Sequence, residues 1–276
     1  MKSINCKGTL IDLASPKVMG ILNITPDSFF DGGKYNNPTV IINHIEKMLS
    51  EGATFVDVGA YSSRPGAKHI SEDEELARIT PVIKLLIKEF PNLLISVDTF
   101  RSLIAEQCIH LGACMINDIS AGNMDTNMFT TVAKLQVPYI MMHMQGTPQT
   151  MQNKPTYSNI IQELLYYFSK KIDELRSLGV NDIITDVGFG FGKTLEQNYE
   201  LLKQLELFKN FEVPTLVGLS RKSMLFKPLE INQNKALNAT TSANTIALLN
   251  GASLLRVHDV KEAMETIKIV ELLNKI

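Results

Sequence analysis

The sequence alternates short apolar, β-branched runs with longer segments of helical periodicity, and this alternation restricts the fold more than any other feature. The apolar runs cover residues 18–24, 55–59, 94–98, 115–118, 139–143, 183–186, 215–219 and 253–257. The helical segments between them cover residues 39–51, 71–89, 101–111, 124–135, 157–178, 195–207, 237–250 and 260–274. Strands that alternate with helices form parallel sheets joined by crossover helices. The pattern predicts an α/β protein built as a single (β/α)8 TIM barrel.

The connections between these segments support the same fold. Glycine follows four of the apolar helical stretches, where a left-handed helix end favours it, at Gly52, Gly112, Gly179 and Gly251. The connections from strand to helix are longer and more polar, at residues 25–38, 60–70, 144–156 and 220–236. Long loops after the strands are typical of barrels that carry an active site at the carboxyl ends of their strands. We therefore expect one barrel over residues 18–276, preceded by an N-terminal extension over residues 1–17 that forms a hairpin at the barrel bottom.

Composition and charge exclude several classes of protein. The chain has 27 Lys and Arg against 29 Asp and Glu, a net charge of −2, which gives no electrostatic footprint for nucleic acid or an anionic membrane. The 3 cysteines are odd in number and lack the spacing of a zinc site or a disulfide framework. The first residues lack the apolar core of a signal peptide, and no apolar run reaches the roughly 18 residues of a membrane span. We expect a cytoplasmic protein with small-molecule partners.

Nearly every predicted strand ends in a polar residue, although a parallel strand buried on both faces is expected to be apolar throughout. These residues are Asn23, Asp57, Asp98, Asn117 with Asp118, His143, Asp186, Ser220 to Lys222, and Arg256 with His258. A purely structural role, satisfied by a neighbouring loop, is a reasonable interpretation of any one of them. All of them together are better explained by one binding site at the mouth of the barrel.

The types of these residues indicate the ligand. Asp98, Asn117 and Asp186 supply acceptors for the N–H groups of a flat, nitrogen-rich heterocycle. Positive charge for a phosphate-like group is expected from Lys222, Arg256 and His258. A purine or pterin that carries a phosphate or diphosphate fits both the acceptor group and the positive group of this site. For Arg256 there is a competing interpretation, a salt bridge to Asp259.

Three loops leave alternatives open. The glycine-rich residues 186–194 miss both the Walker and the dinucleotide-binding patterns by one position, so they either hold Phe191 over a flat ligand or place it in the core. Residues 25–33 contain Asp27 and Asp31 with hydroxyl groups and a glycine pair, and can help to complete an oxygen site for Mg²⁺. The alternative interpretation of residues 25–33, and of the Ser-Ser-Arg-Pro-Gly loop at 62–66, is a plain surface loop without a binding role.

Eight strings, taken together and in this order, resemble the dihydropteroate synthase family from Met19 to Val260. They are MGILNITPDSF, DVG-x-x-SSRPGA, SVDTFRS, INDISAG, MMHMQGTPQTMQ, DVGFGFGKTLEQNYELL, VGLSRKSM and LRVHDV. The resemblance implies a (β/α)8 barrel enzyme that condenses 6-hydroxymethyl-7,8-dihydropterin diphosphate with 4-aminobenzoate in folate biosynthesis. It also implies an SN1-like reaction, Mg²⁺ as cofactor, a homodimer, and a target of sulfonamides.

The resemblance also assigns residues to roles. The pterin would be bound by Asp98, Asn117, Asp186, Lys222 and Phe191. The diphosphate would be bound by Asn23, Arg256 and His258, with Mg²⁺ on Asn23 and with Asp27 or Asp31 as further candidate ligands. The 4-aminobenzoate would be bound by Phe29, Ser63, Arg64, Pro65, Phe191, Lys222 and Ser223. The catalytic set would be Asp98, Asp186, Lys222, Arg256 and His258.

The sequence departs from the family pattern at Tyr61, Ser63, Val187 and Phe30, and none of these changes removes a charged site residue.

Two other functions are compatible with a pterin-binding barrel. A methyltetrahydrofolate:corrinoid methyltransferase would not need the anion-binding groups in SRKSM and RVHDV. A non-catalytic pterin-binding barrel would not need Asn23, Asp27, Phe29 and Arg64 together.

Overall fold

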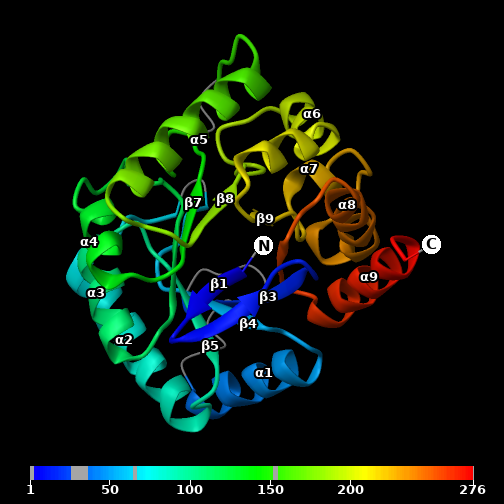
Figure 1. Ribbon diagram of the computed structural model, residues 1–276. Helices are drawn as coiled ribbons and strands as arrows, with labels where there is room; N and C mark the ends of the chain where they lie inside the picture. The colour runs from blue at the N-terminus through cyan, green and yellow to red at the C-terminus, as the bar shows by residue number, and fades with distance from the viewer. Residues whose placement is uncertain (1–2, 26–36, 65–66, 152–154, 276) are drawn as a thin grey trace.

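Parallel strands close into a barrel, as the alternating pattern predicted. The computed structural model describes residues 3–25, 37–64, 67–151 and 155–275. In the closed barrel the strand order is β10-β3-β4-β5-β6-β7-β8-β9, and helices surround it (Figure 1). The barrel strands are β3 (Lys17–Asn23), β4 (Phe55–Gly59), β5 (Leu94–Asp98), β6 (Met115–Asp118), β7 (Tyr139–Met142), β8 (Ile183–Asp186), β9 (Thr215–Val217) and β10 (Leu254–Val257). All eight pairings in this ring are parallel, which confirms the (β/α)8 architecture.

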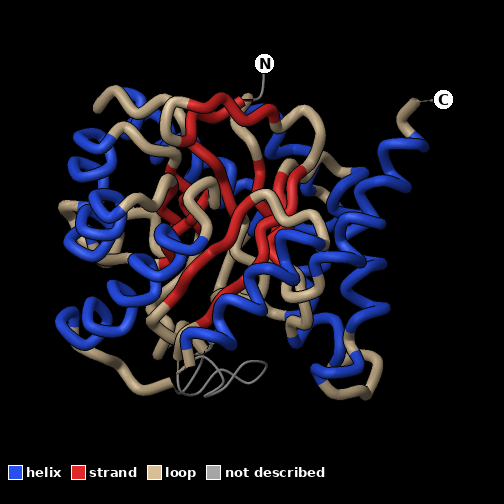
Figure 2. The backbone as a smooth tube through the Cα atoms, turned by 90° about the horizontal axis from the view of Figure 1, so that it is seen from below, coloured by secondary structure: helices blue, strands red, loops and turns tan. Residues whose placement is uncertain are grey.

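The helices lie outside the strands along the length of the barrel (Figure 2). They are α1 (Pro38–Ser50), α2 (Glu72–Glu89), α3 (Ser102–Leu111), α4 (Met128–Leu135), α5 (Ile160–Ser177), α6 (Leu195–Lys203), α7 (Ser223–Phe226), α8 (Leu237–Leu249) and α9 (Val260–Leu273), with 3-10 turns η2 (Leu205–Phe211) and η3 (Gln233–Lys235). The glycines expected at helix ends have positive φ angles, at Gly52, Gly112, Gly179 and Gly251. No helix among the described residues is long and apolar enough to span a membrane.

Some helix bounds differ from those that periodicity predicted. The helix expected over residues 124–135 begins only at Met128, because the Asp125 carboxylate accepts from the backbone N–H groups of Ser102 at 2.7 Å and Asn127 at 2.9 Å and holds a turn there. The segment 195–207 divides into α6 and η2. The loop predicted at 220–236 contains α7 and η3, whose few residues give too little periodicity to detect.

An N-terminal hairpin closes one end of the barrel. Its strands, β1 (Ser3–Cys6) and β2 (Thr9–Asp12), pair antiparallel, and Figure 2 shows them beside the N-terminus, across the barrel end. Ile4, Cys6 and Leu13 pack against inward-facing apolar residues near the amino ends of the strands. The buried residues of this layer are Met19, Phe55, Cys114, Met115, Ile140, Ile184, Leu216 and Leu254. The polar inward residues therefore lie toward the carboxyl ends of the strands. The expected boundary between the N-terminal extension and the barrel, between residues 17 and 18, stays a prediction.

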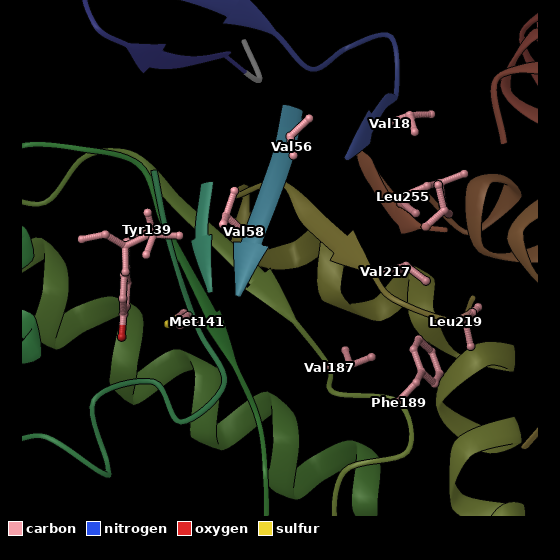
Figure 3. Packing of buried hydrophobic residues seen from close by; sticks show 14 of the residues in the cluster. Val18, Val56, Val58, Tyr139, Met141, Val187, Phe189, Val217, Leu219 and Leu255 are labelled. Atoms are coloured by element: carbon pink, nitrogen blue, oxygen red, sulfur yellow. The ribbon is translucent and has the colours of Figure 1, made fainter. Parts of the chain in front are cut away.

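A second core fills the space between the outer faces of the strands and the helices. Figure 3 shows part of it, including Val56 and Val58 of β4, Tyr139 and Met141 of β7, and Leu255 of β10. These residues alternate along each strand with those that face the barrel interior, as the two-residue period of a strand requires. Apolar burial on the outer face thus fixes which residues of each strand point inward toward the site.

Candidate active site

A cavity of about 370 Å³ opens at the carboxyl ends of the strands. Most of the predicted site residues line it: Asn23, Ser63, Arg64, Asp98, Phe191, Lys222, Ser223, Arg256 and His258. Phe29, Pro65, Asp27, Asp31 and the variant position Phe30 lie outside the described residues. These nine residues therefore line one cavity at the barrel mouth.

Asn117 and Asp186 are buried, and within the part of the chain that the structure describes neither belongs to the cavity wall. The Asn117 Nδ2 group donates to Oδ2 of Asp57 at 2.9 Å. Oδ1 of Asp186 accepts from the backbone N–H of Gly188 at 2.8 Å. Burial raises the pKa of Asp186, and the nearby Lys222 opposes that rise. Asn117 is paired in register with Asp98, which lines the cavity, and the charge of Lys222, another lining residue, acts on Asp186.

Arg256 connects two acidic side chains of the site. Its Nε donates to Oδ2 of Asp57 at 2.6 Å, and its Nη2 donates to Oδ2 of Asp98 at 2.7 Å. The alternative interpretation, a salt bridge between Arg256 and Asp259, is wrong. Asp259 instead accepts from Nε and Nη2 of Arg221, each at 2.8 Å. Arg256 therefore faces the cavity as the sequence predicted, with carboxylates already bound to part of its guanidinium.

Burial determines the protonation of Asp98. Its pKa is raised to about 7 because the carboxyl group is removed from water, while the charge of Arg256 lowers it and the charge of Asp57 raises it further. Asp98 therefore titrates near neutral pH, as acids in functional sites often do.

Asp57 was predicted only as a strand-end residue and was given no role in the site. Its side chain is fully buried in the barrel interior, and its Oδ1 has no hydrogen-bond partner among the described residues. Asp57 faces inward two residues before the end of β4. Every second residue of a strand faces the barrel interior, so a search of all inward-facing positions, and not only of the strand ends, could have identified Asp57.

Lys222 and Phe191 lie together on one wall of the cavity. Lys222 Nζ donates to the carbonyl oxygen of Phe189 at 2.5 Å and lies 4.8 Å from the centre of the Phe191 ring. Burial lowers the pKa of Lys222 to about 8, and the charge of Asp186 opposes this shift. Phe191 is half-buried and lines the cavity, so of the two interpretations left open for it, exposure to a ligand is the one that the structure supports.

Lys193 holds the loop that carries Phe191. Its Nζ donates to the carbonyl oxygens of His143 at 3.1 Å, Gly188 at 2.9 Å and Phe191 at 2.9 Å. It also lies 3.1 Å from Nδ1 of His143. Burial lowers the pKa of His143 to about 2, so the imidazole beside Lys193 is neutral. His143 and Lys193 therefore fix the loop, and the strand-end position of His143 reflects a structural role.

Asp118 also has a structural role. Its carboxylate accepts from Tyr139 Oη and from the backbone N–H groups of Ser120 and Gly122, each at 2.7 Å. These contacts use both carboxylate oxygens to hold the turn after β6. Among the strand-end residues, Asp118 and His143 are thus satisfied by their neighbours.

His258 is positioned by Ser220. Ser220 Oγ lies 3.0 Å from Nδ1 of His258 and accepts from the His258 backbone N–H at 3.2 Å. The hydroxyl can accept from the backbone and donate its own proton to Nδ1 at the same time, an arrangement in which the ring proton lies on Nε2. Burial lowers the pKa of His258 to about 3, with the charge of Arg256 adding to the shift. Burial therefore favours the neutral form of the His258 ring, which can donate a hydrogen bond, and the expectation that His258 supplies positive charge beside a bound diphosphate stays a prediction.

The oxygen atoms at the mouth suit a hard cation that is shared with a ligand. A Cβ on Gly59 would lie 3.4 Å from Oδ2 of Asp98 and 3.6 Å from Oδ1 of Asn23, so both oxygens lie beside Gly59. Within the described ranges no group of three or more His, Cys, Asp or Glu side chains could hold a metal ion. Mg²⁺ commonly binds through one or two protein oxygens together with substrate phosphates and water. Asn23 fits such a site, provided that the ligand supplies further oxygens.

Comparison with known proteins agrees with this geometry. A family model described as "Pterin binding enzyme" matches residues 19–258. Dihydropteroate synthase of Escherichia coli (strain K12) is 41% identical over 267 residues, which cover 96% of this chain and 94% of that protein. The structure of Yersinia pestis dihydropteroate synthase with a sulfonamide drug complex gives a TM-score of 0.95 at 40% identity, covering 99% of this chain and 100% of that one. Xanthomonas albilineans dihydropteroate synthase with 4-aminobenzoic acid gives a TM-score of 0.91 at 34% identity, covering 99% and 98%.

Proposed function

The chain belongs to the pterin-binding enzymes and, within them, to the dihydropteroate synthases, which are transferases, and we propose how its cavity performs their reaction. The substrates are 6-hydroxymethyl-7,8-dihydropterin diphosphate and 4-aminobenzoate, and the products are 7,8-dihydropteroate and pyrophosphate. One observation carries the proposal. A single cavity places the Asp98 carboxyl, the Arg256 guanidinium and the neutral His258 ring within one barrel mouth.

The pterin ring is assigned to the deeper, acidic side of this cavity. Asp98 supplies carboxylate oxygens that can accept from the amino and ring N–H groups of a pterin. Asn117 and Asp186 are buried outside the cavity wall, and we assign them to the acceptor set for the pterin as well. The Lys222 ammonium lies beside the face of the Phe191 ring. From there it can donate a hydrogen bond to an oxygen or nitrogen of the pterin ring. A donor-rich flat ring is the ligand class that this side of the cavity fits.

The diphosphate is assigned to Asn23, Arg256 and His258. Arg256 retains N–H groups beyond the two that bind Asp57 and Asp98. His258 can donate from Nε2 because Ser220 holds its other nitrogen. When bound by Asn23 and the diphosphate oxygens, Mg²⁺ would supply charge that stabilises the leaving pyrophosphate. Asp27 and Asp31 stay predictions as further ligands.

The 4-aminobenzoate is assigned to the outer side of the cavity. Ser63, Arg64, Phe191, Lys222 and Ser223 line this side. The aromatic ring can pack against Phe191, and its carboxylate can accept from hydroxyl or cationic groups. Phe29 and Pro65 stay predictions for the same subsite.

The charges in the cavity favour a loose, SN1-like substitution. The bond between the pterin methylene carbon and the diphosphate oxygen breaks first, leaving a cation on the pterin and both electrons on the pyrophosphate. Asp98 stabilises the cation, and Arg256 and His258 stabilise the anion, each contact contributing roughly 2 to 4 kcal/mol. The neutral amine of 4-aminobenzoate then forms the new carbon–nitrogen bond and loses one proton. Exclusion of water protects the cation from capture while both substrates are bound.

A homodimer in the cytoplasm is the assembly we propose. Large apolar side chains are exposed on α8 and α9, which pack side by side (Figure 1): Ile246, Leu249, Ile269, Leu272 and Leu273. Exposed apolar side chains on two adjacent helices are typical of an interface between subunits. Light scattering on the purified chain tests this assignment by its mass in solution.

Pyrophosphate release tests the proposed reaction. The purified chain should release pyrophosphate only when the pterin diphosphate, 4-aminobenzoate and Mg²⁺ are all present. Release without 4-aminobenzoate would indicate a hydrolase. No release from folded protein that still binds pterin would instead support the non-catalytic barrel considered above, and methyl transfer to a corrinoid would support the other alternative.

A further inference from the structure

Tyr61 occupies a junction between two loops at the cavity rim. Its side chain is buried, with an exposed fraction of 8%, and it lines the cavity beside Ser62, Ser63 and Arg64. We propose that Tyr61 is a positioning residue that ties the loop of Ser63 and Arg64 to the loop after β7, and that this tie sets the affinity for 4-aminobenzoate. The inference rests on the proposed function, since it concerns the second substrate of that reaction.

The Tyr61 hydroxyl makes two hydrogen bonds that join separate segments. It lies 3.0 Å from Nδ1 of His69, which is further along its own loop. It accepts from Nε2 of Gln149 at 2.8 Å, and Gln149 belongs to the loop after β7. Since a tyrosine hydroxyl can donate once and accept at the same time, both contacts can exist together. The hydroxyl therefore connects two strand-end loops that are 88 positions apart in the chain.

Ring contacts fix the orientation of Tyr61. Its ring meets the Phe100 ring edge to face, with centres 5.0 Å apart and planes at 87°. The Arg101 guanidinium carbon lies 5.6 Å from the Tyr61 ring centre. Edge-to-face aromatic pairs and cations near a ring face both favour one orientation of the ring. The phenol thus points toward His69 and Gln149 because its ring is held from the other side.

Arg101 also anchors the far end of the same loop. Its guanidinium donates to the carbonyl oxygens of Ile70 at 2.7 Å and Ser71 at 3.2 Å. The buried carboxylate of Glu75 holds the guanidinium in place through a salt bridge. Arg101 fixes the end of the loop, whereas Tyr61 fixes the part next to Ser63 and Arg64. Loss of the Tyr61 hydroxyl should therefore loosen only that part.

The tie lies on the side of the cavity assigned to 4-aminobenzoate. Tyr61 belongs to a small buried cluster with Met151, and Phe191 packs against the same cluster. All three residues line the cavity. Asp98 and Arg256, which carry the bond-breaking step, contact neither loop through any hydrogen bond found in the described residues. A change at the Tyr61 hydroxyl should consequently alter binding of the second substrate more than the chemistry.

Tyr61→Phe tests the proposal because it keeps the ring and removes only the hydroxyl. The KM for 4-aminobenzoate should rise about three- to tenfold, as expected from the loss of one or two hydrogen bonds. The kcat and the KM for the pterin diphosphate should stay within about twofold of the original values. Tyr166→Phe is the matched control, because Tyr166 is 67% exposed on α5, and it should change none of these constants.

Gln149→Ala tests the tie from its other partner. It should raise the KM for 4-aminobenzoate in the same direction, and the double variant with Tyr61→Phe should show no further rise beyond that of Tyr61→Phe alone. An unchanged KM in Tyr61→Phe would overturn the proposal, as would equal rises in the KM of both substrates or a fall confined to kcat. If the unaltered protein itself releases no pyrophosphate, the proposed function fails; an active protein with an unaffected Tyr61→Phe variant rejects only the role of Tyr61.

Discussion

Arg256 and Asp98 form an ion pair inside the cavity, with 2.7 Å between Nη2 and Oδ2. The same guanidinium binds Asp57, so one cation from β10 joins carboxylates from β4 and β5. Burial makes each of these charges costly without a partner, and the pairing offsets much of that cost. The two side chains to which we assign opposite roles during bond cleavage are therefore already oriented toward each other in the folded chain.

Replacement of Asp98 by asparagine should lower kcat by about tenfold or more, since the amide keeps the shape of the carboxyl group but removes its negative charge. Arg256 would retain Asp57 as a partner, so the variant should fold. Initial rates of pyrophosphate release measure the effect, with a thermal unfolding curve as the control for folding. Turnover equal to that of the original protein would remove Asp98 from the mechanism.

The ionisation of Asp98 should appear in the pH dependence of the reaction. Burial raises the pKa of this carboxyl to about 7, and only the ionised form carries the charge that stabilises the pterin cation. Protonation therefore removes activity, and kcat/KM for the pterin diphosphate should fall as the pH decreases from about 8 to about 6. The quantity kcat/KM reports ionisations of the free enzyme, which is the state with this pKa.

The Asp98→Asn variant is the control for that profile. It should lack the acidic limb near pH 7, because its amide does not titrate there. An unchanged acidic limb in this variant would assign the ionisation to another group.

The sequence was sufficient to predict the barrel and the position of its site, because both depend on local periodicity. Strand ends such as Asp98 and Asn23 stand out where an apolar run is interrupted. The role of Asp57 was missed because it depends on which residues of β4, β5 and β10 face one another across the closed barrel. These strands lie far apart in the chain, and only the ring of pairings brings Asp57, Asp98 and Arg256 together.

Proximity in the sequence also misled one assignment. Arg256 and Asp259 are near neighbours in the chain, but Arg256 faces the barrel interior from β10, whereas Asp259 lies at the start of α9. That position brings Asp259 to Arg221, 38 residues earlier. The low pKa of His258 likewise arises from burial and from the charge of Arg256, and neither is visible in the residue type.

Ser220→Ala should weaken binding of the diphosphate while leaving binding of the pterin ring unchanged. The substitution removes the hydroxyl that holds Nδ1 of His258, so the ring loses its fixed tautomer and orientation. We expect the dissociation constant of the pterin diphosphate to rise about three- to tenfold, the range for the loss of one ordinary hydrogen bond, here the one between Ser220 and His258. Isothermal titration with the pterin diphosphate measures this change.

The same titration with 6-hydroxymethyl-7,8-dihydropterin, which lacks the diphosphate, is the matched comparison for Ser220→Ala. Its affinity should stay the same, because His258 is assigned only to the anion. Equal losses for both ligands would show that Ser220 supports the cavity as a whole and does not act through His258.

Gly188→Ala should prevent the loop after β8 from forming. Gly188 has a φ of +70°, and a Cβ at this position would lie 2.0 Å from the carbonyl oxygen of His143. That oxygen accepts from Lys193, which also holds the carbonyl of Phe191, so the clash cannot be relieved without moving the Phe191 wall. We expect a loss of roughly 3 kcal/mol or more in the free energy of unfolding, measured by urea denaturation.

Gly179→Ala separates this steric effect from backbone strain alone. Gly179 has a similar φ of +81°, but a Cβ there would meet no described atom within 4 Å. Its substitution should therefore cost only about 1 kcal/mol, the usual effect of a left-handed conformation on a residue with a side chain. Similar losses in the two variants would mean that the φ angle accounts for both and that contact between Gly188 and His143 does not constrain the loop. A much larger loss in Gly188→Ala would show that close packing of two strand-end loops holds Phe191 at the cavity.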